Sequence, residues 1–285
     1  MKTTAAGRDW TRKGWPRRAG LLAGTLLVAA CGPPEVIELR GWNASDETNT
    51  ATIDHSAWQE ILETYVDPDP SGVNFFDYAV LSGSPSDMGK LAGYLASLEA
   101  IDPRDFARVE QFAYWVNFYN ALTVKVIVDA YPVDTILDIH EGIVPLTGPW
   151  GDVRTRIAGQ EMTLDEIEHG ILRPIWRDPR IHYAVNCAAY SCPNLGATAF
   201  TAANTEELLE AGAHAYANDS RGVDVLAEDA IALSSIYEWY AVDFGGTESG
   251  VIEHLVSYAN EELAAFLREF EGTIEYRYDW ALNER

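Results

Sequence analysis

Positive charge is scarce in this 285-residue sequence, which has 20 basic and 44 acidic residues and a formal net charge of −24. Residues 1–30 hold six of the basic residues and one of the acidic ones. The rest of the chain therefore has a net charge of −29 and only two lysines, Lys90 and Lys125. A surface of this sign repels phosphates, so we expect neither nucleic acid nor anionic lipid headgroups as partners. We interpret the acidity as an adaptation to a saline or alkaline habitat.

An apolar run long enough to span a bilayer, about 20 residues, is also missing. A shorter stretch, AGLLAGTLLVAA, follows a basic segment from Lys2 to Arg18, and this order is typical of a secretory signal. The letters LVAAC resemble the bacterial lipobox, in which small residues precede a cysteine that becomes lipidated. This resemblance implies a lipoprotein signal peptide at residues 1–30 and lipidation of Cys31. Gly32 stands where an aspartate would favour the inner membrane, so we expect an outer-membrane anchor with the domain facing the periplasm.

The alternative for this N-terminus is an ordinary secretory signal that leaves the cysteine unmodified. In either case the membrane would be contacted through the anchor only. Residues 31–50 are polar and contain two prolines, and they predict a lipidated tether. No repeat or low-complexity tract follows, and 47% hydrophobic residues exclude a disordered chain. Residues 51–285 are predicted to form a single domain with a large core.

Hydrophobic periodicity predicts an α+β fold. Helical spacing of apolar residues recurs within 53–98, and residues 103–131 predict one long helix that is apolar on nearly all sides and therefore central and buried. A hairpin is predicted with its turn at Ala158-Gly159. Further predicted elements are a capping box at 163–166, which opens a helix ending near Pro174, β-rich runs at 181–187, 223–226, 231–236 and 273–280, and helices at 234–244 and 251–270. Because strands follow helices rather than alternate with them, we expect helices packed on a mainly antiparallel sheet.

Cysteine is rare as well, with three residues in the chain. Two of them, Cys187 and Cys192, lie in the stretch RIHYAVNCAAYSCPNL together with His182 and Asn186. Small residues follow Cys187, and if they begin a helical turn, its N–H groups would stabilise a thiolate. A thiolate with a nearby histidine is the nucleophile of thiol hydrolases.

Two histidines are candidate bases. His182 lies on the same predicted strand as Cys187, roughly 16 Å away at the rise of a strand, so the chain must bend for the two to meet. His169 lies on the preceding predicted helix and has no such restriction. Glu166 is one helical turn before His169, whereas Glu168 is directed elsewhere on that helix.

Besides a catalytic role, two other interpretations of the cysteines remain open. In an oxidising periplasm Cys187 and Cys192 would close a disulfide. Alternatively, His182 and both cysteines would bind zinc, although the four-residue gap between the cysteines is wider than in most zinc sites.

The long apolar helix contains two polar residues that need an explanation. Asn117 and Asn120 are one turn apart in an apolar helix, and each must find hydrogen-bond partners or cost about 1–3 kcal/mol. They either tie the helix to a neighbouring loop or stand beside the cysteine as orienting or oxyanion-binding groups. Asp243 and Asp279 are candidate third members of a catalytic group, or helix caps.

Four stretches, in this order, resemble the family called domain of unknown function 547. They are EQFAYWVNFYNALTVKVIVDAYP, LDEIEHGILRPIWRDPRIHYAVNCAAYSCPNL, SSIYEWYAVDFG and YDWALN. With a weaker match before them, they cover residues 52–284.

The histidine–cysteine segment of that family is similar to papain-like thiol hydrolases, a group that includes phytochelatin synthase. The resemblance implies a peptidase or amidase that acts on a small peptide such as glutathione and needs no metal or organic cofactor. By the same resemblance Cys187 would be the nucleophile, His169 or His182 the base, and Glu166 or Glu168 and Asn117 or Asn120 supporting groups. Both histidines precede the cysteine, which implies a permuted papain-like core. The rival is a non-enzymatic binding or scaffold lipoprotein with a Cys187–Cys192 disulfide.

Overall fold

The computed structural model describes residues 38–141 and 147–285. The predicted signal peptide and the predicted lipidation site, Cys31, lie outside these residues. Among the helices within them, none is both long and apolar enough to cross a bilayer.

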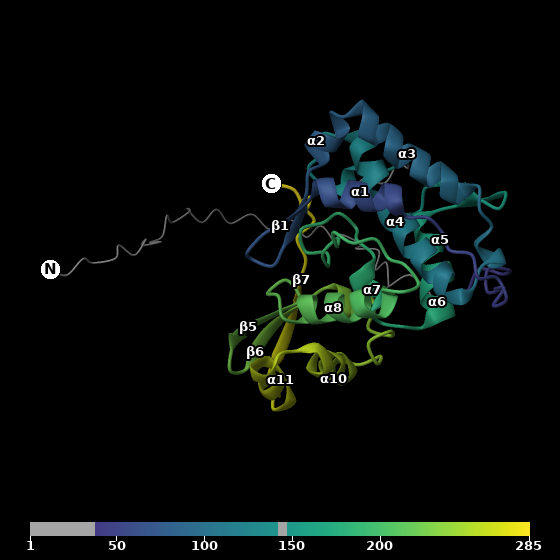
Figure 1. Cartoon of the computed structure of the whole chain (residues 1–285). Coiled ribbons are helices and arrows are strands. Elements are labelled where there is room, and N and C mark those ends of the chain that lie inside the picture. The colour runs from purple at the N-terminus through teal and green to yellow at the C-terminus, as the bar shows by residue number, and fades with distance from the viewer. Residues whose placement is uncertain (1–37, 142–146) are drawn as a thin grey trace, which may run out of the picture. The chain divides into compact units, whose positions relative to one another are not determined.

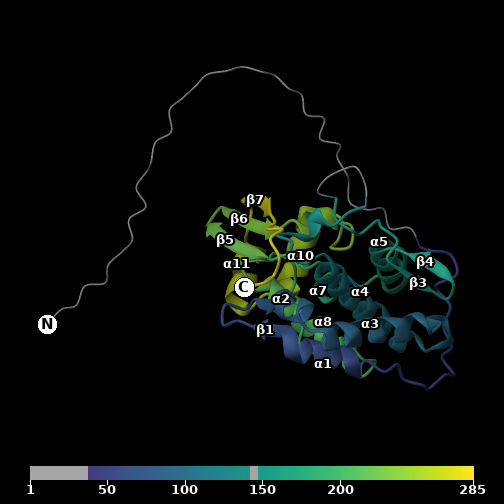
Figure 2. The same cartoon turned by 90° about the horizontal axis from the view of Figure 1, so that it is seen from above.

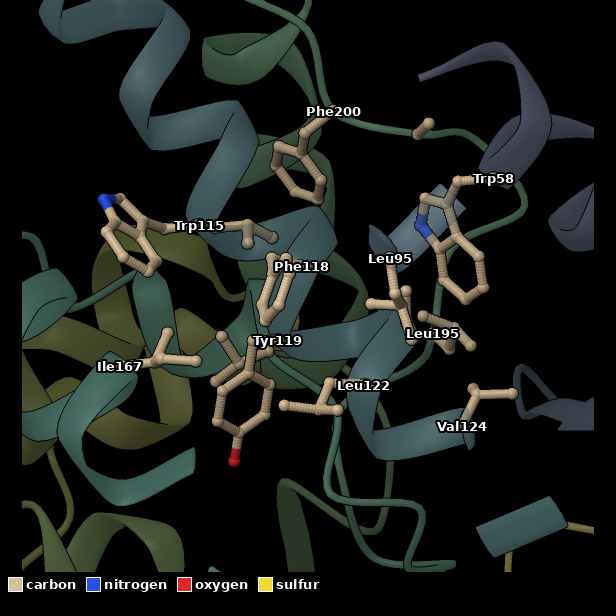
Figure 3. Close-up of a cluster of buried hydrophobic side chains, with 14 of the residues drawn as sticks. Trp58, Leu95, Trp115, Phe118, Tyr119, Leu122, Val124, Ile167, Leu195 and Phe200 are labelled. Atoms are coloured by element: carbon tan, nitrogen blue, oxygen red, sulfur yellow. The ribbon is translucent and has the colours of Figure 1, made fainter. Parts of the chain in front are cut away.

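A group of helices around one buried helix forms the first part of the domain, drawn from purple to teal in Figure 1. The central helix, α4, spans Arg108–Ala130 and is buried at every position from Glu110 to Val124, which confirms the predicted buried helix. Its side chains Phe118 and Leu122 point into the cluster of hydrophobic residues in Figure 3. Around it lie α1 (Ser56–Tyr65), α2 (Tyr78–Ser82), α3 (Pro85–Glu99) and the 3₁₀ turns Pro103–Asp105 and Ile136–Asp138.

Within the described residues the strands form three small sheets, and with the helices they confirm the α+β class. Three pairs are antiparallel: β1 (Val66–Pro68) with β2 (Asn74–Phe76), β3 (Thr155–Ile157) with β4 (Gln160–Met162), and β5 (Val223–Ala227) with β6 (Ala230–Ser234). The predicted turn at Ala158-Gly159 joins β3 to β4, and both residues have the positive φ that a tight two-residue hairpin needs. Strand β7 (Thr273–Arg277) runs parallel to β6, because α9 (Ile236–Trp239), α10 (Glu248–Tyr258) and α11 (Glu261–Arg268) carry the chain back between them.

The helix end predicted near Pro174 is two residues too early. The helix opened by the Thr163–Glu166 capping box begins as α5 (Leu164–Ile167), as predicted, but it runs on through a π-helical turn (Glu168–Leu172) into α6 (Arg173–Trp176). Pro174 has no N–H to give to the carbonyl of Gly170. That carbonyl instead accepts a hydrogen bond from the N–H of Leu39, at 2.8 Å. An external donor therefore lets the helix pass the proline.

The predicted β-run at 181–187 is also wrong, since the chain there forms a short helix, α7 (Ile181–Ala184), and then a loop. A short apolar run does not distinguish a strand from a helix that is buried on several sides. Here Ile181 packs in the hydrophobic cluster around α4, whereas Tyr183 packs in a second cluster between the β5–β6–β7 sheet, α8 (Thr205–Ala217) and α10. Figures 1 and 2 both show α7 between these two parts of the domain.

Part of the segment expected to be a tether packs against the domain. Trp42 is 2% exposed, its ring packs edge-on against Trp115 of α4 at 5.5 Å, and its Nε1 donates to Oε1 of Gln160 at 3.2 Å. Trp42 is therefore part of the core, and Leu39, which also bonds to Gly170, packs against it.

We predict that Trp42→Ala lowers the free energy of unfolding by about 3–5 kcal/mol, the cost of removing a buried tryptophan side chain. Urea unfolding followed by circular dichroism measures this. Val80→Ala, at a position that is 61% exposed, serves as the control and should change stability by less than about 0.5 kcal/mol. If both variants unfold like the wild type, residues 38–50 do act as a tether.

Candidate functional site

The loop that carries Cys187 is held against α4 by a side-chain amide. Nδ2 of Asn120 donates to the carbonyl of Ala184 at 2.9 Å, and Oδ1 of Asn120 accepts the N–H of Asn186 at 2.8 Å. Asn117, one turn earlier, makes the same pair of bonds with the backbone of Phe200. Both asparagines therefore tie the helix to neighbouring loops, and the bonds occupy both ends of each amide.

Asn186 shapes the loop around the cysteine. Its Oδ1 accepts the N–H of Ala188 at 2.9 Å and its Nδ2 donates to the carbonyl of Pro193 at 2.8 Å. Ala188 has φ of +64°, in the left-handed region that costs a non-glycine residue roughly 1–2 kcal/mol. Cys187 consequently lies in an irregular turn, and the helix N-terminus expected at this point is not formed.

The C-terminal segment pairs with this loop and brings a tyrosine to the sulfur. Tyr190 and Ser191 donate their N–H groups to the carbonyls of Ala281 and Asp279, at 2.6 and 3.1 Å. This pairing places the hydroxyl of Tyr278 3.0 Å from Sγ of Cys187. Sequence reasoning missed Tyr278, although it begins the quoted stretch YDWALN.

The two cysteines differ in exposure and in acidity. Both are free thiols; Cys187 is partly exposed, and Cys192 is 5% exposed. Burial raises the pKa of Cys187, but contacts with Cys192, Tyr278 and the N–H of Ala189 outweigh it and the pKa is lowered. Burial raises the pKa of Cys192 well above its ordinary value, and the neighbouring Cys187 adds to the rise. Sγ of Cys192 also accepts the N–H of Cys187 at 3.0 Å. The pair thus favours a thiolate at position 187 and a thiol at position 192.

A buried cluster of charged side chains lies at the π-helical turn. Nε2 of His182 is 2.7 Å from Oδ2 of Asp243, and Nδ1 of His182 is 3.6 Å from Oε1 of Glu168. The same Asp243 oxygen accepts from Nε of Arg173 at 2.6 Å. The ring of Tyr240 stacks on His182 with 4.2 Å between centroids and also lies under the Arg173 guanidinium. We call Glu168, His169, Arg173, His182 and Asp243 the ionised cluster.

His169 belongs to this cluster but differs from His182 in its charge. Its Nδ1 lies 3.1 Å from Nη1 of Arg173 and 3.7 Å from Glu168, and its Nε2 lies 3.6 Å from Asp165. Burial lowers the pKa of His169. Burial also lowers the pKa of His182, but the bonds to Asp243 and Glu168 raise it by more. The cluster therefore favours the protonated form of His182 and the neutral form of His169.

The carboxyl groups in and around the cluster also differ in the direction of their pKa shifts. Burial raises the pKa of Glu168 and of Asp243, but in each case the adjacent cations lower it by more, so both are ionised. In contrast, burial and the charges of Glu168 and Glu166 raise the pKa of Asp165 to about 6. Glu166 uses its carboxylate in the capping box, where Oε2 accepts the N–H of Thr163 at 2.9 Å.

The sulfur and the ionised cluster are close without a direct bond. Within 38–141 and 147–285, the polar partners of the Cys187 sulfur are Tyr278, Cys192 and the N–H of Ala189, and no imidazole is among them. The negative charge of Glu168 nevertheless opposes the ionisation of Cys187. Both groups also lie close enough to Tyr119 and Tyr240 for their charges to raise the pKa of each tyrosine.

Sequence reasoning found three of the five cluster members as site residues, in addition to Asp243 as a candidate, and it missed Arg173. It also missed Asp165 and Tyr240, which stand in quoted stretches but carry no spacing that singles them out. His182 bonds to carboxylates rather than approaching the two sulfurs, and in the described part of the chain no three side chains of the metal-binding types are arranged to hold an ion.

The fold and the site define an α+β protein with a partly exposed cysteine near a buried ionised cluster. Residues 103–217 match the family model described as Protein of unknown function, DUF547. This confirms the family resemblance. The matched segment contains α4, Glu168, both histidines and Cys187, whereas Asp243 and Tyr278 follow it. No curated protein and no solved structure matches the chain.

We predict that Asn120→Leu destabilises the protein by about 2–6 kcal/mol, because a buried carbonyl and a buried N–H each lose a partner at about 1–3 kcal/mol. The same change should also alter the rate at which iodoacetamide labels Cys187, measured by peptide mass spectrometry under native conditions.

Asn117→Leu is the matched control, since it removes the same two kinds of bond from the loop at Phe200. It should cost similar stability and leave the labelling rate of Cys187 unchanged. Equal effects of both variants on labelling would contradict a specific role for Asn120 in placing the thiol.

Proposed function

We propose that this protein is a cysteine-dependent hydrolase that cleaves amide bonds in small peptides, with Cys187 as the nucleophile. The observation that carries the proposal is the thiol of a partly exposed residue, Cys187, which lies 3.0 Å from the Tyr278 hydroxyl and whose pKa is lowered by contacts with Cys192, Tyr278 and the N–H of Ala189. The resemblance to papain-like hydrolases supports the same reaction class. Glutathione is one candidate substrate that this resemblance implies.

The thiolate in this proposal forms without an imidazole beside it. Hydrogen-bond donors that lower the pKa of the thiol supply the ionised nucleophile directly. A histidine is then needed only as the acid that protonates the leaving amine. His182 lies between Glu168 and Asp243, and its raised pKa favours the protonated form, so it is the acid in this proposal.

The proposed reaction has two steps. The Cys187 thiolate attacks the amide carbonyl, a C–S bond forms, the C–N bond breaks, and the amine leaves with a proton from the ionised cluster. Water then attacks the thioester and the C–S bond breaks, which releases the carboxylate and the thiolate. Of the two protons set free, one returns to the cluster and the other passes through solvent to the released amine.

We predict that Tyr278→Phe slows iodoacetamide labelling of Cys187 at pH 6 by roughly 10- to 100-fold. A hydrogen bond to a charged group contributes about 1.5–3 kcal/mol, and its loss raises the thiol pKa so that less thiolate is present at acidic pH. Hydrolysis of short peptides, including glutathione, followed by amine release, should be abolished in Cys187→Ser.

Tyr276→Phe, two residues earlier on β7, is the control and should label like the wild type. Peptide hydrolysis that persists in Cys187→Ser would rule out the hydrolase. So would an intact mass, measured after thiol blocking without reductant, that shows Cys187 and Cys192 joined in a disulfide, because this outcome fits the rival scaffold protein.

We also propose that the protein is a lipoprotein anchored through Cys31 and facing the periplasm, at the outer membrane. The support is the LVAAC stretch after a basic and apolar leader, followed by Gly32. In a bacterial host, the full-length chain should incorporate an alkyne-labelled fatty acid, and Cys31→Ser should incorporate none. Equal incorporation by Cys192→Ser and the wild type is the control, and an unlabelled wild type would contradict the anchor.

A further inference from the structure

Four partly exposed aromatic side chains form a continuous cluster beside the sulfur. Trp239 stacks on Trp280 with 5.6 Å between ring centroids and packs against Tyr278 at 4.8 Å. Tyr278 and Trp280 are 4.6 Å apart, and Trp150 meets Trp280 edge-on at 5.7 Å. Tyr278 is the residue whose hydroxyl contacts Cys187, so these four rings, the ring cluster, adjoin the thiol.

The ring cluster joins the two hydrophobic parts of the domain. Trp150 and Trp280 pack against the core around α4, whereas Trp239 and Tyr278 pack against the core under the β5–β6–β7 sheet. Gly148 makes room for one of these rings, because a Cβ at that position would lie 1.9 Å from the ring of Trp150. All four side chains remain partly exposed, which leaves aromatic surface for a ligand.

The surroundings of the ring cluster are acidic. The N–H of Asp165 donates to the carbonyl of Trp150 at 3.0 Å, and the Asp165 side chain is 46% exposed. Glu238 and Asp279 adjoin Trp239 and Trp280 in the chain, and both are exposed. Burial raises the pKa of Asp165, and the nearby negative charges of Glu168 and Glu166 raise it further.

No cation of the described residues covers these rings. The arginine-over-ring contacts recorded for residues 38–141 and 147–285 involve other aromatic residues, such as Trp42, Trp176 and Tyr240. Arg277, which precedes Tyr278, is paired with Glu275 and with Asp224. Aromatic faces attract cations, and nearby carboxylates strengthen that attraction.

We propose that the ring cluster is a subsite for a cationic side chain of the substrate, so that the enzyme cleaves peptides carrying a basic residue next to the scissile bond. This inference rests on the proposed hydrolase. It disfavours glutathione, whose two carboxylates would meet Asp165 and the other acidic groups.

The test is calorimetric titration of full-length Cys187→Ser, which binds without turnover, with N-acetyl-lysine methylamide and its neutral counterpart N-acetyl-norleucine methylamide. The lysine probe should bind at least about tenfold more tightly. Trp280→Leu, added to this chain, should weaken binding of the lysine probe by roughly 3- to 30-fold, the factor expected for one lost cation–ring contact.

Asp165→Asn keeps all four rings and should also weaken binding of the lysine probe, so the inference stays testable if Trp280→Leu misfolds. Trp176→Leu and Glu63→Gln are the matched controls for ring and charge, and both should bind like the parent chain. Equal affinity for the two probes, tighter binding of a neutral disaccharide, or no measurable binding of the lysine probe would overturn the subsite.

The outcomes separate the two proposals. Binding of the lysine probe by a protein that hydrolyses no peptide would remove the hydrolase and leave the subsite. Hydrolysis of peptides without preference for basic residues would remove the subsite and leave the hydrolase.

Discussion

The amide of Asn120 fixes the position of the candidate nucleophile. A side-chain amide carries a donor and an acceptor, and these match the carbonyl of Ala184 and the N–H of Asn186 in a region that water does not reach. Moving the loop would leave buried polar groups unpaired, at about 1–3 kcal/mol each. The turn at Ala188 and the pairing of this loop with the C-terminal segment both follow from that placement, and so does the contact of Tyr278 with the sulfur.

The ionised cluster is stable because its charges compensate one another. His182 has a carboxylate on each side, and Asp243 receives both His182 and Arg173. Buried charges are costly unless they are paired and hydrogen-bonded in this way. The helix that carries Glu168, His169 and Arg173 passes Pro174 only because Leu39, from a segment well before it, satisfies the carbonyl of Gly170. The hydrogen bond from Leu39 thus stabilises the helix that carries three of the cluster residues.

In the proposed hydrolase, the group that attacks the substrate and the group that supplies a proton are separate. Donors from the C-terminal segment and the loop itself lower the pKa of Cys187, while the proton remains in a cluster held by the π-helical turn and α7. The negative charge of Glu168 acts against the thiolate, and the contacts with Cys192, Tyr278 and the N–H of Ala189 offset it. A cationic group bound near Asp165 would act in the same direction as Tyr278 and favour the ionised sulfur.

Local patterns in the sequence determined much of the fold. The buried α4, the hairpin at Ala158-Gly159 and the Thr163–Glu166 cap depend on hydrophobic periodicity and on turn and capping chemistry within a few residues, and all three were predictable. The sequence also marked Cys187, His182 and Asn120 as unusual. It did not determine that residues 181–184 are helical, that Trp42 belongs to the core, or that the helix continues past Pro174. Only the tertiary structure decided these, because each depends on partners distant in the chain. For the same reason no spacing could reveal that Tyr278, 91 residues after Cys187, is the side chain that contacts its sulfur.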